Sequence, residues 1–533
     1  MTAQEAYQHL DPQQWANTSI HERLYLLEKV RSNLGKYAEE LAAADTKMKN
    51  DIMGEEIFRN PESMVGTAVP IANTLSACIH LYESLAKGKM PEAEKVTQVK
   101  EGLYDVEVKP LDAKDRLIAG NQRFHLRTKG VPKQINPMEK PAGIIAVSGA
   151  GNYSSSLEMV KAMFLENCTV IHKPHQLNEA TDRIWEKVFQ PLVEAKAIAF
   201  CDADQGRKMT TLEGLSKIYF TGGTSTAKAI MQATNTPLVS ECGGNNPLIV
   251  VPGDRAWTAK EMEHQANQII TAAKLNGGAV CGRPQTIITS RGWAQREAFL
   301  EALKKAIVEG TPAAGTYYPG SDKVKQDFLD QYPKAQVLSP EHGRFKHGDF
   351  IFIEDVAADS YAVQHEAFCQ IMNEIPLDVA ANAAAFLPAA TEFCNHQLLG
   401  TLGCMIILDE DTQKAHSAVL DETVTALNYG GIAVNTIPPL IFFNPLLTWG
   451  GNEEGKTFVS GIGNFGNVYC FENIEKSILY DDFMSPGHLM RTNQKAFDHL
   501  SIHMTDFALQ PSWINLTRLV GGAVVDSFRK KDF

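Results

Sequence analysis

Apolar residues recur at steps of three and four positions in the first hundred residues, and this spacing predicts helices. Between residues 20 and 50 the recurring positions include Leu27, Val30, Leu34 and Leu41, which predicts a pair of amphipathic helices. Residues 60–90 show a second helical pattern. Residues 95–140 are rich in charges and turn residues, so we expect mixed, turn-rich structure there.

From Pro141 onward, short apolar runs alternate with segments of helical periodicity. Five runs predict strands, and they lie at residues 143–147, 169–173, 197–201, 217–223 and 237–241. Helices are predicted between them, from about Ser155, over 179–194 and over 225–233, and Ser155 with Glu158 has the spacing of a capping box. Alternation of strands and helices indicates a parallel sheet with helices on both faces. Such sheets bind nucleotides at the carboxyl ends of their strands.

The second half of the chain shows the same alternation with less regularity. Residues 246–435 predict a second α/β unit with a long helix at 258–276. The tail from residue 482 has no clear pattern until residues 513–528. These could form a helix that covers the site or a neighbouring subunit, or one that packs on its own chain.

Length and charge narrow the class of protein. The chain has 533 residues, enough for two or three domains. A net charge of -13 at pH 7 argues against nucleic acid or an anionic membrane as a partner, because both would repel it. No apolar window reaches the roughly 18 residues of a membrane span, and the amino terminus lacks a signal-peptide core. We expect a cytoplasmic protein.

The nine cysteines are odd in number and include no CxxC pair. A disulfide framework or a zinc site is therefore not expected, and no metal is predicted. Reduced cysteines fit a cytoplasmic location. One of them, Cys281, stands apart because it follows two glycines and an alanine.

Five short motifs follow one another along the chain. Four lie at predicted strand ends and the fifth carries Cys281; they are SGAGNYSSS (148–156), HKPHQ (172–176), FTGGTS (220–225), ECGGNNP (241–247) and LNGGAVC (275–281). In this order, with about forty residues from the glutamate to the cysteine, the chain resembles the aldehyde dehydrogenase superfamily. HEAFCQI (365–371) resembles a sixth motif of that family. The resemblance runs from about residue 15 to 482.

The resemblance implies an α/β fold in three parts with an added tail. We expect a Rossmann-type parallel-sheet cofactor domain, a second α/β catalytic domain and a small β element for oligomerisation. The expected bounds are 1–117 and 139–243 for the cofactor domain, 244–470 for the catalytic domain, 118–138 and 471–482 for the oligomerisation strands, and 483–533 for a carboxy-terminal extension. Family members pair through such strands, so a homodimer or homotetramer is expected.

The resemblance also implies three catalytic roles. Cys281 is the expected nucleophile, Glu241 the general base and Asn152 a donor to the oxyanion. Aldehyde oxidation suits these residue types: a thiolate adds to the carbonyl, an amide N–H stabilises the oxyanion, and a carboxylate activates the water that hydrolyses the thioester. The alternatives are a core cysteine, an ion-paired strand-end glutamate and a turn asparagine.

Further residues are expected to hold a nicotinamide cofactor. By the resemblance, Lys173 bonds a ribose, the segment Gly222, Gly223 and Thr224 begins a helix near the pyrophosphate, and Glu366 with Phe368 lies at the nicotinamide ribose. Three residues after Lys173 the family often has a glutamate, which would repel a 2′-phosphate. This chain has the neutral Gln176, so we expect NADP to be accepted, alongside or instead of NAD.

Several positions depart from the family pattern and leave the substrate open. Ala279 replaces a glutamine, and Asn245 replaces a lysine; the other departures are Ala150, Gly151, Ser154, Cys369 and Gln370. The leading function is NAD(P)-dependent oxidation of an aldehyde to a carboxylic acid. The alternatives are a CoA-acylating aldehyde dehydrogenase and a non-catalytic paralogue. The apolar stretch 437–449 would suit a medium-chain or aromatic aldehyde, or it is ordinary core.

Overall fold

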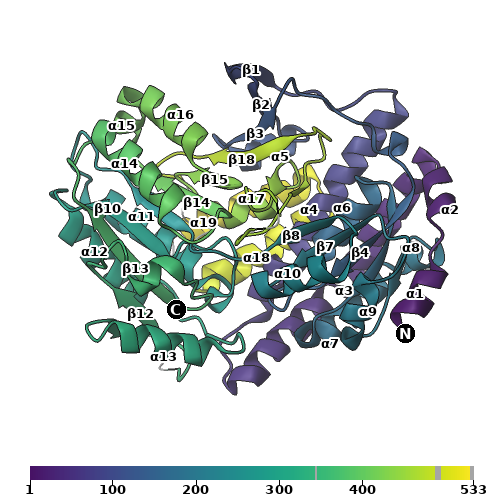
Figure 1. Ribbon diagram of the computed structural model, residues 1–533, viewed down its shortest axis with the longest axis horizontal. Coiled ribbons are helices and arrows are strands. Elements are labelled where there is room, and N and C mark those ends of the chain that lie inside the picture. The colour runs from purple at the N-terminus through teal and green to yellow at the C-terminus, as the bar shows by residue number, and fades with distance from the viewer. Residues whose placement is uncertain (342–344, 456, 486–493, 529–533) are drawn as a thin grey trace.

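The amino-terminal part is helical up to residue 86, as the spacing predicts. The structure is a computed structural model and describes residues 1–341, 345–455, 457–485 and 494–528 (Figure 1). The first helices are α1 (Ala3–His9), α2 (Pro12–Asn17), α3 (Ile20–Met53) and α4 (Asn60–Ala86). The predicted helix pair over residues 20–50 is wrong, because α3 is one helix of 34 residues. Packing along α4 outweighs the roughly 1 kcal/mol penalty of Gly35 in its interior.

The predicted nucleotide-binding sheet has five parallel strands in the order β6-β5-β4-β7-β8. Its strands are β4 (Gly143–Ser148), β5 (Cys168–Lys173), β6 (Ile198–Phe200), β7 (Lys217–Thr221) and β8 (Leu238–Glu241). Its helices are α6 (Ser156–Phe164), α7 (Glu179–Val188), α8 (Gln190–Glu194), α9 (Gly206–Thr210) and α10 (Thr224–Ala233). The helix expected over 179–194 is divided at Phe189, one residue before α8 begins with Pro191 in its first turn.

The start of α6 differs from the prediction. Ser155 is the N-cap residue, but its φ of 54° is left-handed and its side chain makes no capping bond. Its hydroxyl instead accepts from the N–H of Ala150 at 3.2 Å. A capping box needs an extended N-cap residue whose hydroxyl faces the helix. The predicted capping box is therefore wrong, and the Glu158 carboxyl is released for other contacts.

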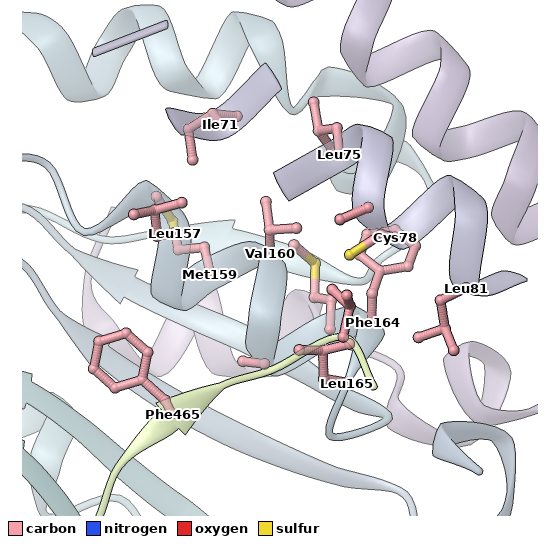
Figure 2. Packing of buried hydrophobic residues seen from close by; sticks show 14 of the residues in the cluster. Ile71, Leu75, Cys78, Leu81, Leu157, Met159, Val160, Phe164, Leu165 and Phe465 are labelled. Atoms are coloured by element: carbon pink, nitrogen blue, oxygen red, sulfur yellow. The ribbon is translucent and has the colours of Figure 1, made fainter. Parts of the chain in front are cut away.

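Helix α6 lies in the core between α4 and the five-stranded sheet. All nine of its residues are buried. Figure 2 shows its apolar side chains, among them Leu157, Val160 and Phe164, between those of α4 and Phe465 of the short strand β17 (Phe465–Gly466). Side chains from distant parts of the sequence thus pack around α6. This packing holds the helix in place and with it the loop that precedes it.

The second sheet has eleven strands in the order β1-β2-β3-β18-β15-β14-β9-β10-β13-β12-β11. The first four strands are antiparallel neighbours: β1 (Lys95–Lys100), β2 (Leu103–Val108), β3 (Arg123–Lys129) and β18 (Ile474–Tyr480). The core strands are β9 (Pro247–Val250), β10 (Thr286–Ser290), β13 (Ile371–Leu377), β14 (Gly403–Ile407) and β15 (Gly431–Val434), with β12 (Phe350–Ile353) and β11 (Gln336–Leu338) at the far edge.

The other α-helices before the tail are α5 (Ala113–Ala119), α11 (Ala259–Lys274), α12 (Arg296–Lys305), α13 (Ser321–Gln331), α14 (Ala383–His396), α15 (Glu410–Ala415), α16 (Ser417–Ala426) and α17 (Pro439–Phe443). The two-residue strand β16 (Thr448–Trp449) pairs with β17 in a separate small sheet. Strands β1 and β2 join β3 in the eleven-stranded sheet, whereas the expected bounds placed residues 95–117 in the cofactor domain. The division into domains stays a prediction.

The tail forms two helices that pack on their own chain, α18 (Gln494–Leu509) and α19 (Trp513–Ser527). Helix α18 lies against α4, and α19 lies against α18. Helix α4 is long and apolar enough to cross a membrane, with a mean hydropathy of 1.3 over its best window. That window is 61% buried, which is typical of a core helix.

Arg23 joins the first helices. Its guanidinium is fully buried and donates to Trp15 O at 2.7 Å, to the Tyr82 hydroxyl at 2.9 Å and to the Asn167 side chain. It also lies 4.4 Å from the centre of the Trp15 ring. One side chain therefore connects α2, α3, α4 and the loop before β5.

We expect Arg23→Met to lower the free energy of unfolding by roughly 2–4 kcal/mol, because three buried acceptors lose their donor. Arg31→Met is the control: Arg31 pairs with Glu28 near the surface of α3, and its loss should change stability by less than about 1 kcal/mol. Denaturant titration of both variants measures the difference. Equal stability of the two variants would contradict the role of Arg23.

Candidate active site

Cys281 follows a tight turn at the end of α11. Asn276, Gly277 and Gly278 have φ values of 49°, 67° and 84°, in the left-handed region that glycine and asparagine tolerate. A Cβ at Gly277 would lie 2.0 Å from the Gly315 carbonyl oxygen. Neither glycine can be replaced without moving a neighbouring backbone. Cys281 is partly buried, and the other eight cysteines are buried.

Glu241 ends β8 and reaches the Cys281 thiol. The carboxyl is buried, with the residue 2% exposed. It accepts hydrogen bonds from the thiol of Cys281 and, at 3.2 Å, from the indole N–H of Trp449. The predicted nucleophile and the predicted base are therefore in direct contact.

Trp449 is a site residue to which the sequence assigned no role. Its indole is 1% exposed and lies among glycines from three segments. A Cβ would come within 2.7 Å of the indole at Gly431 and 2.8 Å at Gly282, and within 3.4 Å at Gly403. These glycines leave the space in which the ring can point its N–H at Glu241. The signal in the sequence was three separate glycines, which spacing alone could not connect.

Burial sets the charges of the pair. It raises the pKa of Glu241, against the lowering effect of its two donors, Cys281 and Trp449. Burial, and then the nearby Glu241, raise the pKa of the Cys281 thiol well above its usual value. Glu366 also acts on this thiol, and burial raises the pKa of Glu366 to about 7. Both groups are therefore harder to ionise here than in water, and the thiol donates to the carboxyl.

Three asparagines fix the backbone around the thiol. Asn152 donates its side-chain N–H to Ala279 O at 3.1 Å, and Asn276 donates to the same oxygen at 3.2 Å. Asn246 donates to Cys281 O at 2.6 Å and to Arg283 O at 2.9 Å. The Asn152 amide therefore lies at the cysteine loop with a second N–H left for a ligand. Asn246 lies inside the ECGGNNP motif, but no pattern in the sequence predicts that it bonds the cysteine loop.

The expected cofactor residues lie at the carboxyl edge of the five-stranded sheet. Lys173 ends β5, and its side chain passes over Gly206, where a Cβ would lie 3.2 Å from Lys173 Cδ. Gln176 is exposed at the start of the turn that follows. Gly222 and Gly223 precede α10, and Thr224 begins it. The hydroxyl of Thr224 donates to Val459 O at 2.7 Å.

Glu366 and Phe368 come from the second sheet. A Cβ at Gly243 would lie 2.0 Å from a Glu366 carboxyl oxygen, so this glycine admits the carboxyl beside the ECGG segment. Glu366 also accepts from the N–H of Gly244. The Phe368 ring lies 5.0 Å from that of Tyr318. The structure thus brings Glu366 to the Glu241–Cys281 pair, while Lys173 and Gln176 belong to the other end of the site.

The residues fit a dinucleotide. Helix α10 has ten residues, begins after a glycine and has no side-chain cap, so its first N–H groups are open to a phosphate. Strand β4 lies between β5 and β7, which is the switch point where such sheets bind nucleotides. Among the described residues, no group of three or more His, Cys, Asp or Glu side chains is arranged for a metal ion.

The apolar stretch 437–449 lies against the site. Phe442 is buried in α17, 5.3 Å from the Tyr153 ring and 6.2 Å from the Trp449 ring. Phe443 is only partly buried beside it. The stretch therefore packs as core and also lines the neighbourhood of the pair.

Comparison with known proteins supports the same fold and family. The model of the aldehyde dehydrogenase family matches residues 116–317. N-succinylglutamate 5-semialdehyde dehydrogenase 1 of Caulobacter vibrioides is 28% identical over 212 residues, which cover 38% of this chain and 43% of that protein. The chain thus matches about two fifths of the length of this relative.

Solved structures match over most of the chain. The NADP-dependent glyceraldehyde-3-phosphate dehydrogenase of Bacillus halodurans, complexed with NADP, has a TM-score of 0.61 at 15% identity and covers 90% of each chain. An NAD-dependent aldehyde dehydrogenase of Sinorhizobium meliloti has a TM-score of 0.61 at 16% identity and covers 90% of this chain and 84% of its own. The predicted fold class is confirmed.

We expect Glu241→Gln to speed alkylation of Cys281 by iodoacetamide at neutral pH, by roughly threefold to tenfold. A carboxylate beside the thiol disfavours the thiolate, which is the reactive form, so its removal moves the reaction to lower pH. The rate of labelling against pH measures this, with Cys281→Ala as the blank. An unchanged pH profile would contradict the contact.

Proposed function

Because this chain belongs to the aldehyde dehydrogenase superfamily, by the match over residues 116–317 and the fold shared over most of its length, we propose that it oxidises an aldehyde to a carboxylic acid with a nicotinamide cofactor. The observation that carries the proposal is the contact between the Cys281 thiol and the Glu241 carboxylate. A nucleophile beside a base is the arrangement that acyl chemistry requires.

The first half of the reaction makes a thioester on Cys281. Glu241 takes the thiol proton, and the thiolate adds to the aldehyde carbon. The free N–H of Asn152 stabilises the oxyanion that forms. A nicotinamide cofactor held by Lys173 and the start of α10 would supply the acceptor for a hydride from that carbon. As the hydride leaves, the C=O bond re-forms and the carbon stays bonded to the Cys281 sulfur.

The second half is hydrolysis. Glu241 removes a proton from water, and the hydroxide adds to the thioester carbon; the C–S bond then breaks and returns the thiolate. The buried Glu241 supports water as the acceptor, since transfer to CoA would need no base at this position. The same contact argues against a non-catalytic paralogue, in which nothing would maintain a buried thiol–carboxylate pair.

The substrate proposal is an aldehyde with an apolar body. Phe442 and Phe443 support it, because they place aromatic surface beside the site. For the cofactor, the neutral Gln176 supports acceptance of NADP. The oligomeric state and the cytoplasmic location stay predictions.

Wild-type protein is expected to reduce NAD or NADP with an aldehyde panel that includes medium-chain and aromatic members. Cys281→Ala should lower kcat by at least about a thousandfold, and Glu241→Gln by roughly 10²–10⁴-fold. Absorbance of the reduced nicotinamide and analysis of the acid product, with and without CoA, measure this. Turnover that depends on CoA, or no turnover at all, would contradict the proposal.

Gln176→Glu is expected to raise the KM for NADP by about tenfold or more, because a carboxylate there repels the 2′-phosphate. The KM for NAD should change by less than about threefold, since its ribose carries no charge. Gln98→Glu, on the exposed strand β1, is the matched control. Equal KM values for NADP in wild type and Gln176→Glu would show that this position does not face the ribose.

A further inference from the structure

Helix α6 carries two ionisable side chains in a fully buried segment. Glu158 is 1% exposed and Lys161 is 2% exposed. Their neighbours on the helix pack into the apolar layer between α4 and Phe465 that Figure 2 shows. Burial of a charged group is unfavourable, and replacing a buried ion pair by apolar residues of similar size is often neutral or stabilising. Packing alone therefore does not explain why Glu158 and Lys161 lie in this helix.

The Glu158 carboxyl is held by two hydroxyl groups. Thr221 Oγ1 donates to Glu158 Oε1 at 3.2 Å, and the Tyr153 hydroxyl donates to Oε2. These contacts replace the capping box that the sequence predicted for Glu158. The carboxyl also accepts from its own backbone N–H in the first turn of α6.

Thr221 connects this carboxyl to the proposed base. Thr221 and Glu241 are paired positions on the neighbouring parallel strands β7 and β8. The backbone continues the pairing, because Gly222 N–H donates to Glu241 O at 3.1 Å. Paired residues of parallel strands lie on the same face, about 4.8 Å apart. Thr221 thus bonds Glu158 through its hydroxyl and is the neighbour of Glu241 across the sheet.

The titratable groups around Glu158 come from four segments. Lys161 lies one turn on along α6, Tyr153 precedes the helix, Tyr219 belongs to β7 and Glu241 to β8. Burial raises the pKa of Glu158, and Glu241 raises it further. Burial lowers the pKa of Lys161, whose amine lies 4.9 Å from the Phe465 ring and also faces Cys78 of α4. Both side chains can thus exchange protons near neutral pH.

The proposed reaction makes such an exchange necessary. Oxidation of an aldehyde by NAD(P) and water yields a carboxylate, a reduced cofactor and two protons at neutral pH. At least one of these protons passes through Glu241, which is buried and must lose it before the next cycle. We propose that Glu158 receives this proton by way of the Thr221 hydroxyl; this rests on the proposed function.

The transfer balances as a relay. The O–H bond of protonated Glu241 breaks and its proton bonds to Thr221 Oγ1, while the original Thr221 proton bonds to Glu158 Oε1. Glu241 returns to the carboxylate, and Glu158 becomes the carboxylic acid. Glu158 then releases its proton by way of Tyr153, which is only partly buried; its hydroxyl passes one proton to water as it receives another. Glu158 acts through Glu241 and touches no reacting atom of the substrate.

The test separates acylation of Cys281 from hydrolysis of the thioester. The probe is p-nitrophenyl acetate, which acylates a reactive thiol without cofactor and releases a coloured leaving group. A rapid burst reports acylation, and the later steady rate reports deacylation. We expect Glu158→Gln to keep the burst rate within about threefold of wild type and to lower the steady rate by about tenfold or more.

Two further comparisons distinguish proton transfer from structural support. Thr221→Val should slow deacylation as Glu158→Gln does, and Thr221→Ser, which keeps the hydroxyl, should stay within about threefold of wild type. After the rate with Cys281→Ala at the same imidazole concentration is subtracted, rising imidazole should restore the steady rate of Glu158→Gln, and a packing defect would not respond. Glu166→Gln is the matched control, because Glu166 pairs with Lys140 and Lys217 away from the pair.

The outcomes are distinct. A slowed steady rate with an intact burst and buffer rescue supports the relay. An unchanged steady rate in both Glu158→Gln and Thr221→Val overturns it, and so does an equal loss of burst and steady rate without rescue. If the wild type shows a burst and turns over aldehydes while Glu158→Gln is normal, the relay alone fails. If the wild-type protein shows no burst and no turnover of aldehydes, the proposed function and the relay both fail.

Discussion

A carboxylate buried at the end of a parallel strand is the constraint on which the rest of the site depends. Glu241 loses its contact with water, and this is tolerable only because the Trp449 indole and the Cys281 thiol donate to it. The indole in turn needs glycine at two positions in other segments, Gly282 and Gly431. Cys281 needs a left-handed turn and Asn246 to hold its carbonyl. One buried charge therefore constrains backbone in both sheets.

Much of the fold could be predicted because its pattern is local. The strands of the five-stranded sheet are short apolar runs, and each is found within two residues of its predicted place. Predictions failed where a distant partner decided the outcome. Helix α3 runs unbroken because it packs along α4, and Ser155 leaves its capping position because its hydroxyl bonds the Ala150 N–H. Neither partner can be recognised from the spacing of residues.

In the candidate site, too, local motifs could be recognised from the sequence and distant partners could not. Cys281, Glu241 and Asn152 were found through their motifs, and the structure places them around one loop. Trp449 was not assigned, because it lies 208 residues from the carboxyl that it contacts. Glu158 was assigned to a helix cap, since its sequence neighbours suit one; its actual partner, Thr221, lies 63 residues away. Motifs locate the candidate reacting groups, whereas the side chains that contact them are brought there by the tertiary fold.

The packing of α18 on α4 has a consequence for how the chain reaches its native state. Helix α4 is the long apolar helix of the amino-terminal layer, and part of its cover is synthesised about 400 residues later. At translation rates of roughly 5–20 residues per second, that interval lasts about 20–80 s. During this interval the apolar face of α4 lacks the cover of α18 while the chain is still on the ribosome. Such a chain depends on chaperones, or on transient cover from its own helices, more than its final burial suggests.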